Sequence, residues 1–350
     1  MYCNSSRPGS RHASALVLLG VFVGILAIAP VVAQDKTDKP PELKLSTAVA
    51  PAFPLGKAGE RWAQLINEKA GRAFEVQQYP GAVLSGRDPG REFGALKDGA
   101  ADLAVGTALA WSSQLPAFGV YALPWLAMEP REQEAVATDI AVRDRVAAEA
   151  ARAGVVVLAV APLGERVLAT VKGAVRTPAE IGGLHVRVTP IPLVIETFSA
   201  LGARAEAMGF ALAQAAFVAG TLDGQEALPS TLAATRIGAT GQKFVTRWGA
   251  FADVMVFAVR RPVWDAWSDD QRAFVRAAAV DAARDAGALA REEAAFGELT
   301  RQGVTIVKLT PAQRAAFRAA AQPVWDRWTS AIGADLVKGA EAVAAAAATK

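Results

Sequence analysis

The sequence predicts an α/β protein with two lobes. Segments patterned like strands alternate with segments patterned like helices from Leu43 onward, an order typical of parallel sheets covered by helices. The alternation continues through the second half of the chain, without a convincing tandem repeat. After the N-terminal segment roughly 300 residues remain, a length at which two domains are expected.

In the first half, turn residues separate the elements. Strand 74–79 is stopped by Pro80-Gly81, and helix 91–98 ends at Gly99. The run of valine, leucine and alanine over 155–160 predicts a buried strand. The expected elements are strands 43–47, 74–79, 101–106 and 155–160, and helices 55–70, 91–98 and 129–153.

The second half repeats this order and ends in helices. Ser268 and Thr310 each precede a glutamine by three residues, which fits a capping box at a helix start. The expected elements are strands 184–188, 222–226 and 253–259, helices 191–201, 210–219, 268–296 and 310–332, and an alanine-rich helical end.

The N-terminal segment has the order of a secretory signal peptide. Arg7 and Arg11 precede an uncharged run over 15–29, which Pro30 breaks, and small residues end at Ala33. The run is short for a membrane span, although an uncleaved anchor is the alternative. We expect cleavage after Ala33, export to the periplasm and a linker over 34–41.

Composition excludes several kinds of chemistry. Of 37 Lys and Arg, two lie in the first 33 residues, so 35 stand against 34 Asp and Glu, a net charge of +1. This gives no reason to expect nucleic acid as a partner. The single cysteine, Cys3, leaves with the signal peptide, and His185 is then the remaining histidine. We therefore expect no cysteine nucleophile, no metal site and no cofactor.

A set of short motifs, in order and at matching spacing, resembles the extracytoplasmic solute-binding subunit of tripartite ATP-independent periplasmic (TRAP) transporters, the dicarboxylate-binding-protein family. The resemblance covers about 43–335. The matching segments are 78–81 with Leu84, 96–102, 118–120, 123–126, 183–188, 201–203, 220–226, 261–265 and 270–272.

This resemblance implies a periplasmic-binding-protein fold with a ligand cleft between its lobes, no enzymatic activity, and capture of a small organic acid for the membrane subunits of the transporter. Lobe I is expected over 42–164 with about 253–294, and lobe II over 165–252 with about 295–345. The segment from Ser268 is the expected long connecting helix. Monomer and homodimer both stay open.

Arg187 is the first expected ligand residue. Simple alternation in strand 184–188 places Val186 on one face and His185 and Arg187 on the other, where an arginine is ordinarily solvated. In the family this arginine holds the ligand carboxylate. A planar guanidinium suits that role, because it presents two parallel N–H groups.

Further residues carry weaker expectations. Arg166 lies near the family's second basic contact, although Glu165 beside it could neutralise it, and an interdomain salt bridge is the alternative. Phe210 matches a position that packs on the ligand. The tryptophans Trp111, Trp125 and Trp248 are candidate walls. Core packing is the competing interpretation for all four aromatic residues.

Two departures from the family pattern predict a less polar pocket. Ala227 stands where the family has an asparagine whose amide contacts the ligand, and 208–212 lacks the usual proline and glutamate. We expect a monocarboxylate with a more apolar body than a sugar acid, such as a 2-oxo, aromatic or branched acid. The alternatives are presentation of a ligand to a signalling receptor, a secreted enzyme using two carboxylates, and a scaffold.

Overall fold

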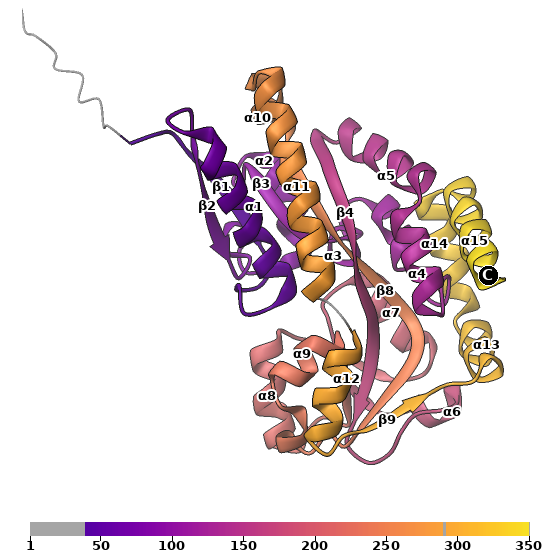
Figure 1. Ribbon diagram of the computed structural model, residues 1–350. Helices are drawn as coiled ribbons and strands as arrows, with labels where there is room; N and C mark the ends of the chain where they lie inside the picture. Colours follow the sequence, from indigo (N-terminus) through magenta and orange to yellow (C-terminus); the bar gives the residue numbers. More distant parts are fainter. Residues whose placement is uncertain (1–38, 290–291, 350) are drawn as a thin grey trace, which may run out of the picture. The chain divides into compact units, whose positions relative to one another are not determined.

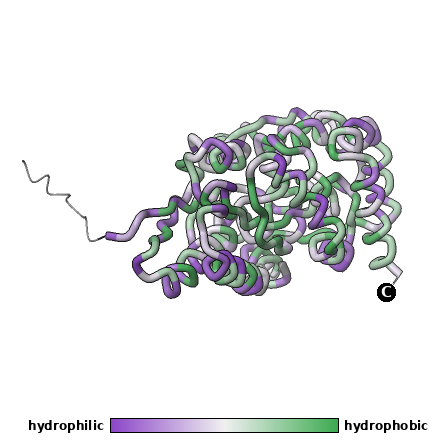
Figure 2. The backbone as a smooth tube through the Cα atoms, turned by 90° about the horizontal axis from the view of Figure 1, so that it is seen from above, coloured by the Kyte–Doolittle hydropathy of each residue, from purple (hydrophilic) through white to green (hydrophobic). Residues whose placement is uncertain are grey.

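The computed structural model describes residues 39–289 and 292–349, and within these ranges it leaves out the side chains of 210–211, 288–289 and 292. The predicted signal peptide and most of the predicted linker therefore lie outside the described residues. Strands and helices alternate as expected (Figure 1). Hydrophobic stretches run through the middle of the described body, and hydrophilic ones lie mostly around it (Figure 2).

The described strands form one mixed sheet of nine strands in the order β2-β1-β3-β8-β4-β7-β5-β6, with β9 paired to β8. The strands are β1 (Glu42–Thr47), β2 (Glu75–Pro80), β3 (Leu103–Thr107), β4 (Val155–Thr170), β5 (His185–Val188), β6 (Arg204–Ala207), β7 (Gly224–Ala227), β8 (Phe244–Arg260) and β9 (Thr305–Lys308).

Two long antiparallel strands, β4 and β8, connect the two halves of this sheet (Figure 1). At one end β8 pairs with β3, and at the other β4 pairs with β7. The expected strands 155–160 and 253–259 were too short, because Pro162 and Gly164 interrupt the apolar pattern of β4. Both lie at a register shift, where a strand tolerates proline.

The first half surrounds β1, β2 and β3. Helix α1 (Pro54–Ala70) buries Trp62 and Ile66 in a core that includes Leu45 and Phe257. Helix α11 (Asp269–Leu289) packs against α1 and β4. The remaining helices here are α2 (Glu92–Asp98), α3 (Ala108–Trp111), α4 (Pro130–Thr138), α5 (Ile140–Arg152) and α10 (Arg261–Ala266), with 3-10 turns η1 (Val83–Ser85), η2 (Pro89–Arg91) and η3 (Pro116–Tyr121).

The second half surrounds β5, β6 and β7. Helix α12 (Glu292–Arg301) packs against α9 and β9, so the segment that begins after Ser268 contacts both halves. The other helices here are α6 (Pro178–Ile181), α7 (Pro192–Ala200), α8 (Phe210–Val218) and α9 (Pro229–Ala234), with the 3-10 turn η4 (Ile237–Thr240).

Two predicted helices are divided. Helix 129–153 breaks at Asp139, whose carboxylate accepts a hydrogen bond from the Val142 N–H and begins α5. Helix 310–332 breaks at Ala321 into α13 (Pro311–Ala320) and α14 (Gln322–Ile332). Both predicted capping boxes are present, at Ser268 and Thr310.

The last helix, α15 (Ala334–Ala348), packs against α4 and α5 (Figure 1). The sequence-based division assigned residues up to about 345 to lobe II, but these contacts place α15 with helices of 42–164. Its apolar positions, among them Leu336, Val337 and Ala340, cover the same core as α14. Sequence pattern alone does not give this packing, because an alanine-rich helix fits many surfaces.

Candidate functional site

Four neighbouring strands bring four charged side chains together in the middle of the sheet. Asp253 on β8, Arg166 on β4, Glu226 on β7 and Arg187 on β5 follow the strand order β8-β4-β7-β5. We call these four residues the arginine row. Their exposed fractions are 2%, 8%, 0% and 5%. Burial of charge is costly unless the charges are paired, so the pairing defines this site.

Arg187 is held by backbone carbonyls. Its Nε donates to the Met208 carbonyl at 3.0 Å, and its Nη1 donates to the Glu226 carbonyl at 3.2 Å. Burial lowers the pKa of Arg187, Glu226 raises it and Arg166 lowers it further. The simple alternation argument predicted a solvated arginine. The structure buries it at 5% exposure, against the carbonyls of Met208 after β6 and Glu226 on β7.

Arg166 is locked in a charged network. Its Nε donates to Glu226 Oε2 at 2.6 Å, and its Nη2 donates to Thr189 Oγ1 at 2.9 Å. The Thr189 N–H donates to Glu226 Oε1 at 2.8 Å. Burial alone would raise the pKa of Glu226, but the charge and hydrogen bond of Arg166, with help from Arg187 and Thr189, lower that pKa to about 2. The Glu226 carboxylate therefore stays ionised and pairs with Arg166, while the Glu226 carbonyl accepts a hydrogen bond from Arg187.

Asp253 lies at the other end of the row. Its Oδ1 accepts hydrogen bonds from the N–H groups of Leu109 at 3.2 Å and Val254 at 2.9 Å. Its Oδ2 is 3.7 Å from Arg166 Nη1 and makes no hydrogen bond of normal geometry with a described group. Burial raises the pKa of Asp253 to about 6, although the charge of Arg166 acts against this.

Glu165 does not neutralise Arg166. It pairs instead with Arg247 on β8, and Arg247 also contacts Glu293 and lies over the Phe296 ring. Successive side chains of a strand point to opposite faces, so Glu165 and Arg166 lie on different faces of the sheet. Arg166 finds its partners in Glu226 and Asp253.

Sequence reasoning had assigned no role to Thr189, Glu226 or Asp253. A signal was present for two of them. Glu226 belongs to a motif that carried the family resemblance, and Asp253 interrupts an apolar run with a carboxylate. Thr189 has no comparable signal, because its role depends on the meeting of β5 with β7.

Two of the candidate aromatic walls, Trp111 and Trp248, are core residues in this structure. Trp248 is buried against the rings of Trp125 and Phe198 and donates its Nε1–H to the Arg166 carbonyl at 3.1 Å. Trp111 is buried with Phe93 and donates to Glu92 at 3.3 Å. Both side chains thus pack in aromatic clusters, and a role as ligand wall stays a prediction for each.

Ala227 and Phe210 stay predicted ligand neighbours. Ala227 follows Glu226 on β7 and belongs to a hydrophobic cluster with Val167 and Leu232. Its methyl group offers no hydrogen bond, in keeping with a less polar surrounding. Phe210 begins α8, but its side chain lies outside the described ones.

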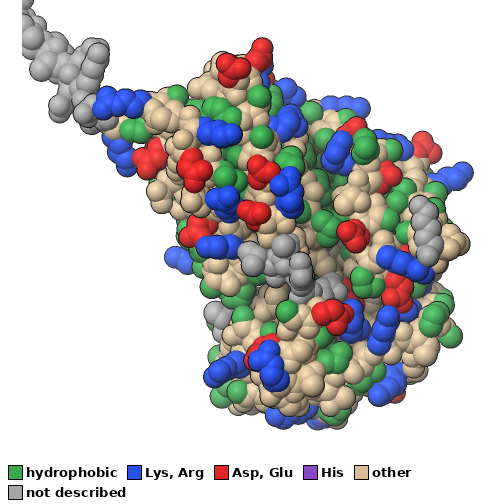
Figure 3. Space-filling model, viewed as in Figure 1, with side chains coloured by type: hydrophobic (Ala, Val, Ile, Leu, Met, Phe, Trp, Pro, Cys, Tyr) green, Lys and Arg blue, Asp and Glu red, His purple; other side chains and the backbone are tan. Residues whose placement is uncertain are grey.

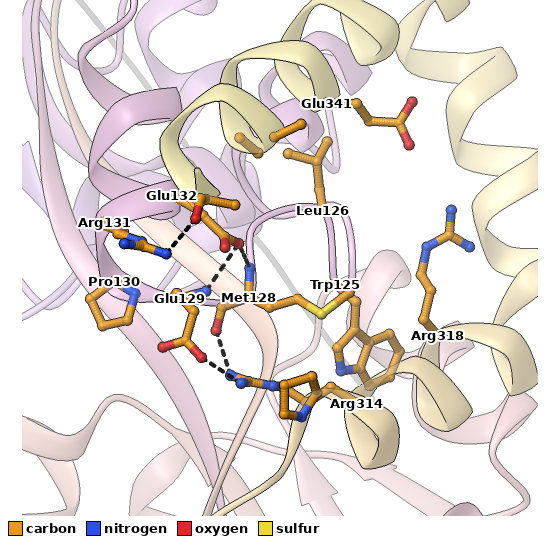
Figure 4. A pocket seen from close by; sticks show the side chains of 14 residues that line it. Trp125, Leu126, Met128, Glu129, Pro130, Arg131, Glu132, Arg314, Arg318 and Glu341 are labelled. Atoms are coloured by element: carbon orange, nitrogen blue, oxygen red, sulfur yellow. Dashed lines mark hydrogen bonds and ion pairs between the residues drawn. The ribbon is translucent and has the colours of Figure 1, made fainter. Parts of the chain in front are cut away.

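A groove is lined by residues other than those of the arginine row. This groove of about 920 Å³ runs between the start of α4, α13 and α15, with Trp125, Leu126 and Met128 along it (Figure 4). Its cations are already engaged: Arg314 contacts Glu129 and the Met128 carbonyl, and Arg318 stacks on the Trp325 ring. The groove therefore lacks the convergence of buried charge that defines the row.

The surface and the remaining acidic residues were compared with the arginine row. The face in Figure 3 shows acidic and basic side chains interspersed. Within 39–289 and 292–349, no group of three His, Cys, Asp or Glu side chains is placed to hold a metal ion. In the same ranges no helix is both long and apolar enough to cross a bilayer.

Comparison with known proteins identifies the fold. Residues 45–331 match the family model described as bacterial extracellular solute-binding protein, family 7. A TRAP periplasmic solute-binding protein from Ralstonia eutropha H16, solved with bound (S)-2-acetolactate, is 39% identical, with a TM-score of 0.82 over 87% of this chain and 98% of that chain.

Two further relatives are also periplasmic solute-binding proteins. A TRAP periplasmic solute-binding protein from Bordetella, whose ligand density was assigned to pantoate, is 26% identical with a TM-score of 0.74, covering 86% of this chain and 98% of that one. The C4-dicarboxylate-binding periplasmic protein DctP of Rhodobacter capsulatus is 25% identical over 94% of this chain and 98% of its own. The chain belongs to bacterial extracellular solute-binding protein family 7, the solute-binding proteins of TRAP transporters.

Proposed function

We propose that this solute-binding protein captures a small branched monocarboxylate through Arg187 and delivers it to TRAP membrane subunits, without chemistry of its own. The observation that carries the proposal is the arginine row, in which two buried arginines flank Glu226. Arg166 binds its carboxylate, and Arg187 binds its carbonyl. A buried guanidinium oriented by carbonyl oxygens is suited to bind a carboxylate in two parallel hydrogen bonds.

The roles of the two arginines differ. Arg166 has a carboxylate partner at 2.6 Å and a hydroxyl partner at 2.9 Å, so it is largely committed to the protein. Arg187 donates to two carbonyl oxygens, which fix the plane of its guanidinium. We assign the primary ligand contact to Arg187, whose position in the family holds the ligand carboxylate, and a supporting contact to Arg166 on β4.

The preference for an apolar, compact body rests on two observations. Ala227 replaces the family's asparagine with a methyl group that lies in the cluster with Val167 and Leu232, and the segment 208–212 is apolar in sequence. The relative from Ralstonia eutropha, at 39% identity, was solved with a branched four-carbon chain acid, 2-hydroxy-2-methyl-3-oxobutanoate. The ligand density of the relative from Bordetella was assigned to pantoate, another branched acid.

Capture proceeds by lobe closure. The crossing strands β4 and β8 divide the lobes near Arg166 and Asp253, and α11 and α12 contact opposite halves. Closure over a carboxylate would exclude water and strengthen its pairing with Arg187. A ligand that prefers the closed form shifts the protein toward the state that docks on the membrane subunits. Export with cleavage after Ala33 places the protein in the periplasm.

The proposal is tested by isothermal titration of the purified protein with branched 2-oxo and 2-hydroxy monocarboxylates, sugar acids and C4-dicarboxylates. We expect micromolar binding of a branched monocarboxylate. Arg187→Ala removes two charge-assisted hydrogen bonds of about 1.5–3 kcal/mol each, so affinity should fall at least 100-fold. Arg204→Ala, on the neighbouring strand β6 and exposed, is the matched control.

Two results would overturn the proposal. Binding of sugar acids alone would exclude the apolar pocket, and binding that survives Arg187→Ala would move the carboxylate site away from the arginine row. A loss of binding in the Arg204→Ala control as well would indicate a general charge effect instead of a specific contact.

A further inference from the structure

His185 lies on β5 two residues before Arg187, and its imidazole contacts two hydrogen-bond acceptors. Its Nδ1 is 2.7 Å from the Thr221 carbonyl oxygen, and its Nε2 is 2.5 Å from Glu206 Oε2. A carbonyl oxygen and an ionised carboxylate accept hydrogen bonds and donate none. Both ring nitrogens must therefore carry protons, so this arrangement requires the imidazolium form of His185.

Glu206 is the register partner of Arg187 on the neighbouring strand β6. Partner residues point to the same face of a sheet, and neighbouring strands lie about 4.8 Å apart, so opposite charges at such positions ordinarily attract each other. The Arg187 side chain extends toward the end of β6, where its Nε donates to the Met208 carbonyl at 3.0 Å. Glu206 is thus a neighbour of the proposed ligand arginine, and the structure pairs its carboxylate with His185 instead.

We infer that His185 is a positioning residue for ligand capture: its imidazolium holds the Glu206 carboxylate away from Arg187, and loss of its proton releases Glu206 to compete with the ligand. The inference rests on the proposed function, because it takes Arg187 as the contact for the ligand carboxylate. A carboxylate of the protein on that guanidinium would occupy the donors and neutralise the charge that the ligand requires. Protonation of His185 therefore raises the affinity for acids.

The neutral form of His185 follows from the same two contacts. The Thr221 carbonyl requires a donor, so the proton that leaves the imidazolium is the one on Nε2. The lone pair of Nε2 then faces the Glu206 carboxylate, and the two groups repel each other. Histidine side chains ordinarily change their charge between about pH 5 and pH 8. The pairing is thus complete in acid and is lost as the pH rises.

Other charged groups adjoin His185. Arg204 is its register partner on β6, and Asp223, just before β7, accepts a hydrogen bond from the His185 N–H at 3.0 Å. Lys172, which follows β4, lies 3.4 Å from Asp223. The hydrogen bond from the His185 N–H and the charge of Lys172 lower the pKa of Asp223. Asp223 is therefore ionised throughout this pH range, and the change of charge lies at His185.

Calorimetric titration with 3-methyl-2-oxobutanoate at pH 5.5 and pH 8.5 tests the inference. Between these pH values the affinity of the wild type should fall at least about 3-fold more than that of Glu206→Gln, a size suited to a partly exposed pair. His185→Ala should bind at least about 3-fold more weakly than Glu206→Gln at both pH values, and the double variant should regain the affinity of Glu206→Gln. His185→Lys keeps a cation and should bind tightly at both.

Two comparisons remove other effects of pH and charge. Burial raises the pKa of Asp253 to about 6, so Asp253 titrates in the same range. It is unaltered in every variant, so its contribution cancels when variants are compared at one pH. Glu298→Gln, at an exposed pair with Arg301 on α12, is the matched control and should follow the wild type.

A measurement without ligand tests the same contacts. His185 is the only histidine of the chain besides His12, so nitrogen NMR of a ¹⁵N-labelled sample reports the protonation of its ring directly. We expect protons on both ring nitrogens at pH 5.5, and on Nδ1 in the neutral form. A neutral form protonated on Nε2 would overturn the inference.

Full affinity in His185→Ala at pH 5.5 would also overturn it. So would a loss that the double variant does not restore, because that result indicates a merely structural role. If His185→Ala fails to fold, His185→Lys and the nitrogen spectra decide. Binding that survives Arg187→Ala is a failure of the proposed function, whereas loss in Arg187→Ala without rescue in the double variant is a failure of this inference alone. Failure of the wild type to bind the probe would overturn the branched-acid proposal and the affinity claim with it.

Discussion

Two glutamates in this protein each lie between two cations, and their surroundings give them different uses. Glu129 joins Lys308 and Arg314 beside the groove in Figure 4, where it is partly exposed and connects α4, β9 and α13. Glu226 pairs its carboxylate with Arg166 and accepts a hydrogen bond from Arg187 at its backbone carbonyl, with no exposed surface. The first pairing connects surface elements, whereas the second holds two arginines inside the sheet, where we propose that the ligand carboxylate binds.

The comparison teaches that a large groove and a cluster of buried charges lie in different places in this protein, and we propose the second as the binding site. The groove is large, but solvent can reach its charges and they have local partners. The arginine row offers little visible opening, yet burial makes each of its charges costly and each interaction strong. A ligand carboxylate gains most where water is excluded and the donors are already oriented.

The largest expected effect comes from removing the charge of Glu226. Glu226→Gln leaves two buried arginines without a neighbouring carboxylate at this position, and loss of one partner of a buried pair costs about 3–5 kcal/mol. The matched change Glu129→Gln, at a partly exposed pair, should cost about 0–1 kcal/mol. Urea unfolding of both variants measures the difference, and equal losses would contradict the comparison.

Acid should unfold the protein partly through Glu226. Its folded-state pKa of about 2 lies below the usual value near 4.5, so its stabilising contribution is complete above pH 4.5 and is lost as the pH falls toward 2. We expect the free energy of unfolding of Glu226→Gln to vary less than that of the wild type over this window. A pH series of chemical unfolding checks this, and parallel curves would be the contrary result.

Glu92 should behave in the opposite way. Burial raises its pKa to about 7, although the Ser46 hydroxyl and Trp111 indole bind it, so the stability of the wild type falls as the pH rises from 4.5 through 7. Glu92→Gln removes this dependence and should unfold at the same or a higher temperature than the wild type at pH 8. A lower unfolding temperature at pH 8 would show that the ionised form is stabilising.

The smallest expected effect is at Lys308. Its side chain is 54% exposed where it contacts Glu129, and exposed pairs contribute about 0–1 kcal/mol. Lys308→Ala should leave both the unfolding midpoint and the affinity for the acid nearly unchanged. A large loss of affinity would show that the groove communicates with the arginine row.

The sequence predicted most of the helices and strands, but not the length of the two central strands of the sheet. Strands β4 and β8 extend through polar residues such as Glu165 and Arg166, which ordinarily mark a loop. They remain strand because each side chain finds a partner on another element. The division of 129–153 at Asp139 was readable as an N-cap, whereas the packing of α15 depends on tertiary contacts that no local pattern specifies.

For the site, Arg187 was proposed from the family resemblance, since alternation alone favoured a solvated side chain. The partners of Arg166 could not be chosen from the sequence, because adjacent Glu165 points elsewhere and Glu226 is sixty positions away. Asp253 was the detectable omission, a carboxylate within an apolar strand. Such a residue is a signal for a buried polar role even before its partners are known.

The central claim is that the ligand carboxylate binds at Arg187. A crystal structure of the protein with the tightest-binding acid of the titration panel tests it most directly. We predict carboxylate oxygens within hydrogen-bonding distance of the Arg187 guanidinium and the apolar body of the acid on the Ala227 side. A carboxylate bound in the groove at Arg314 or Arg318, with Arg187 uninvolved, would contradict the account.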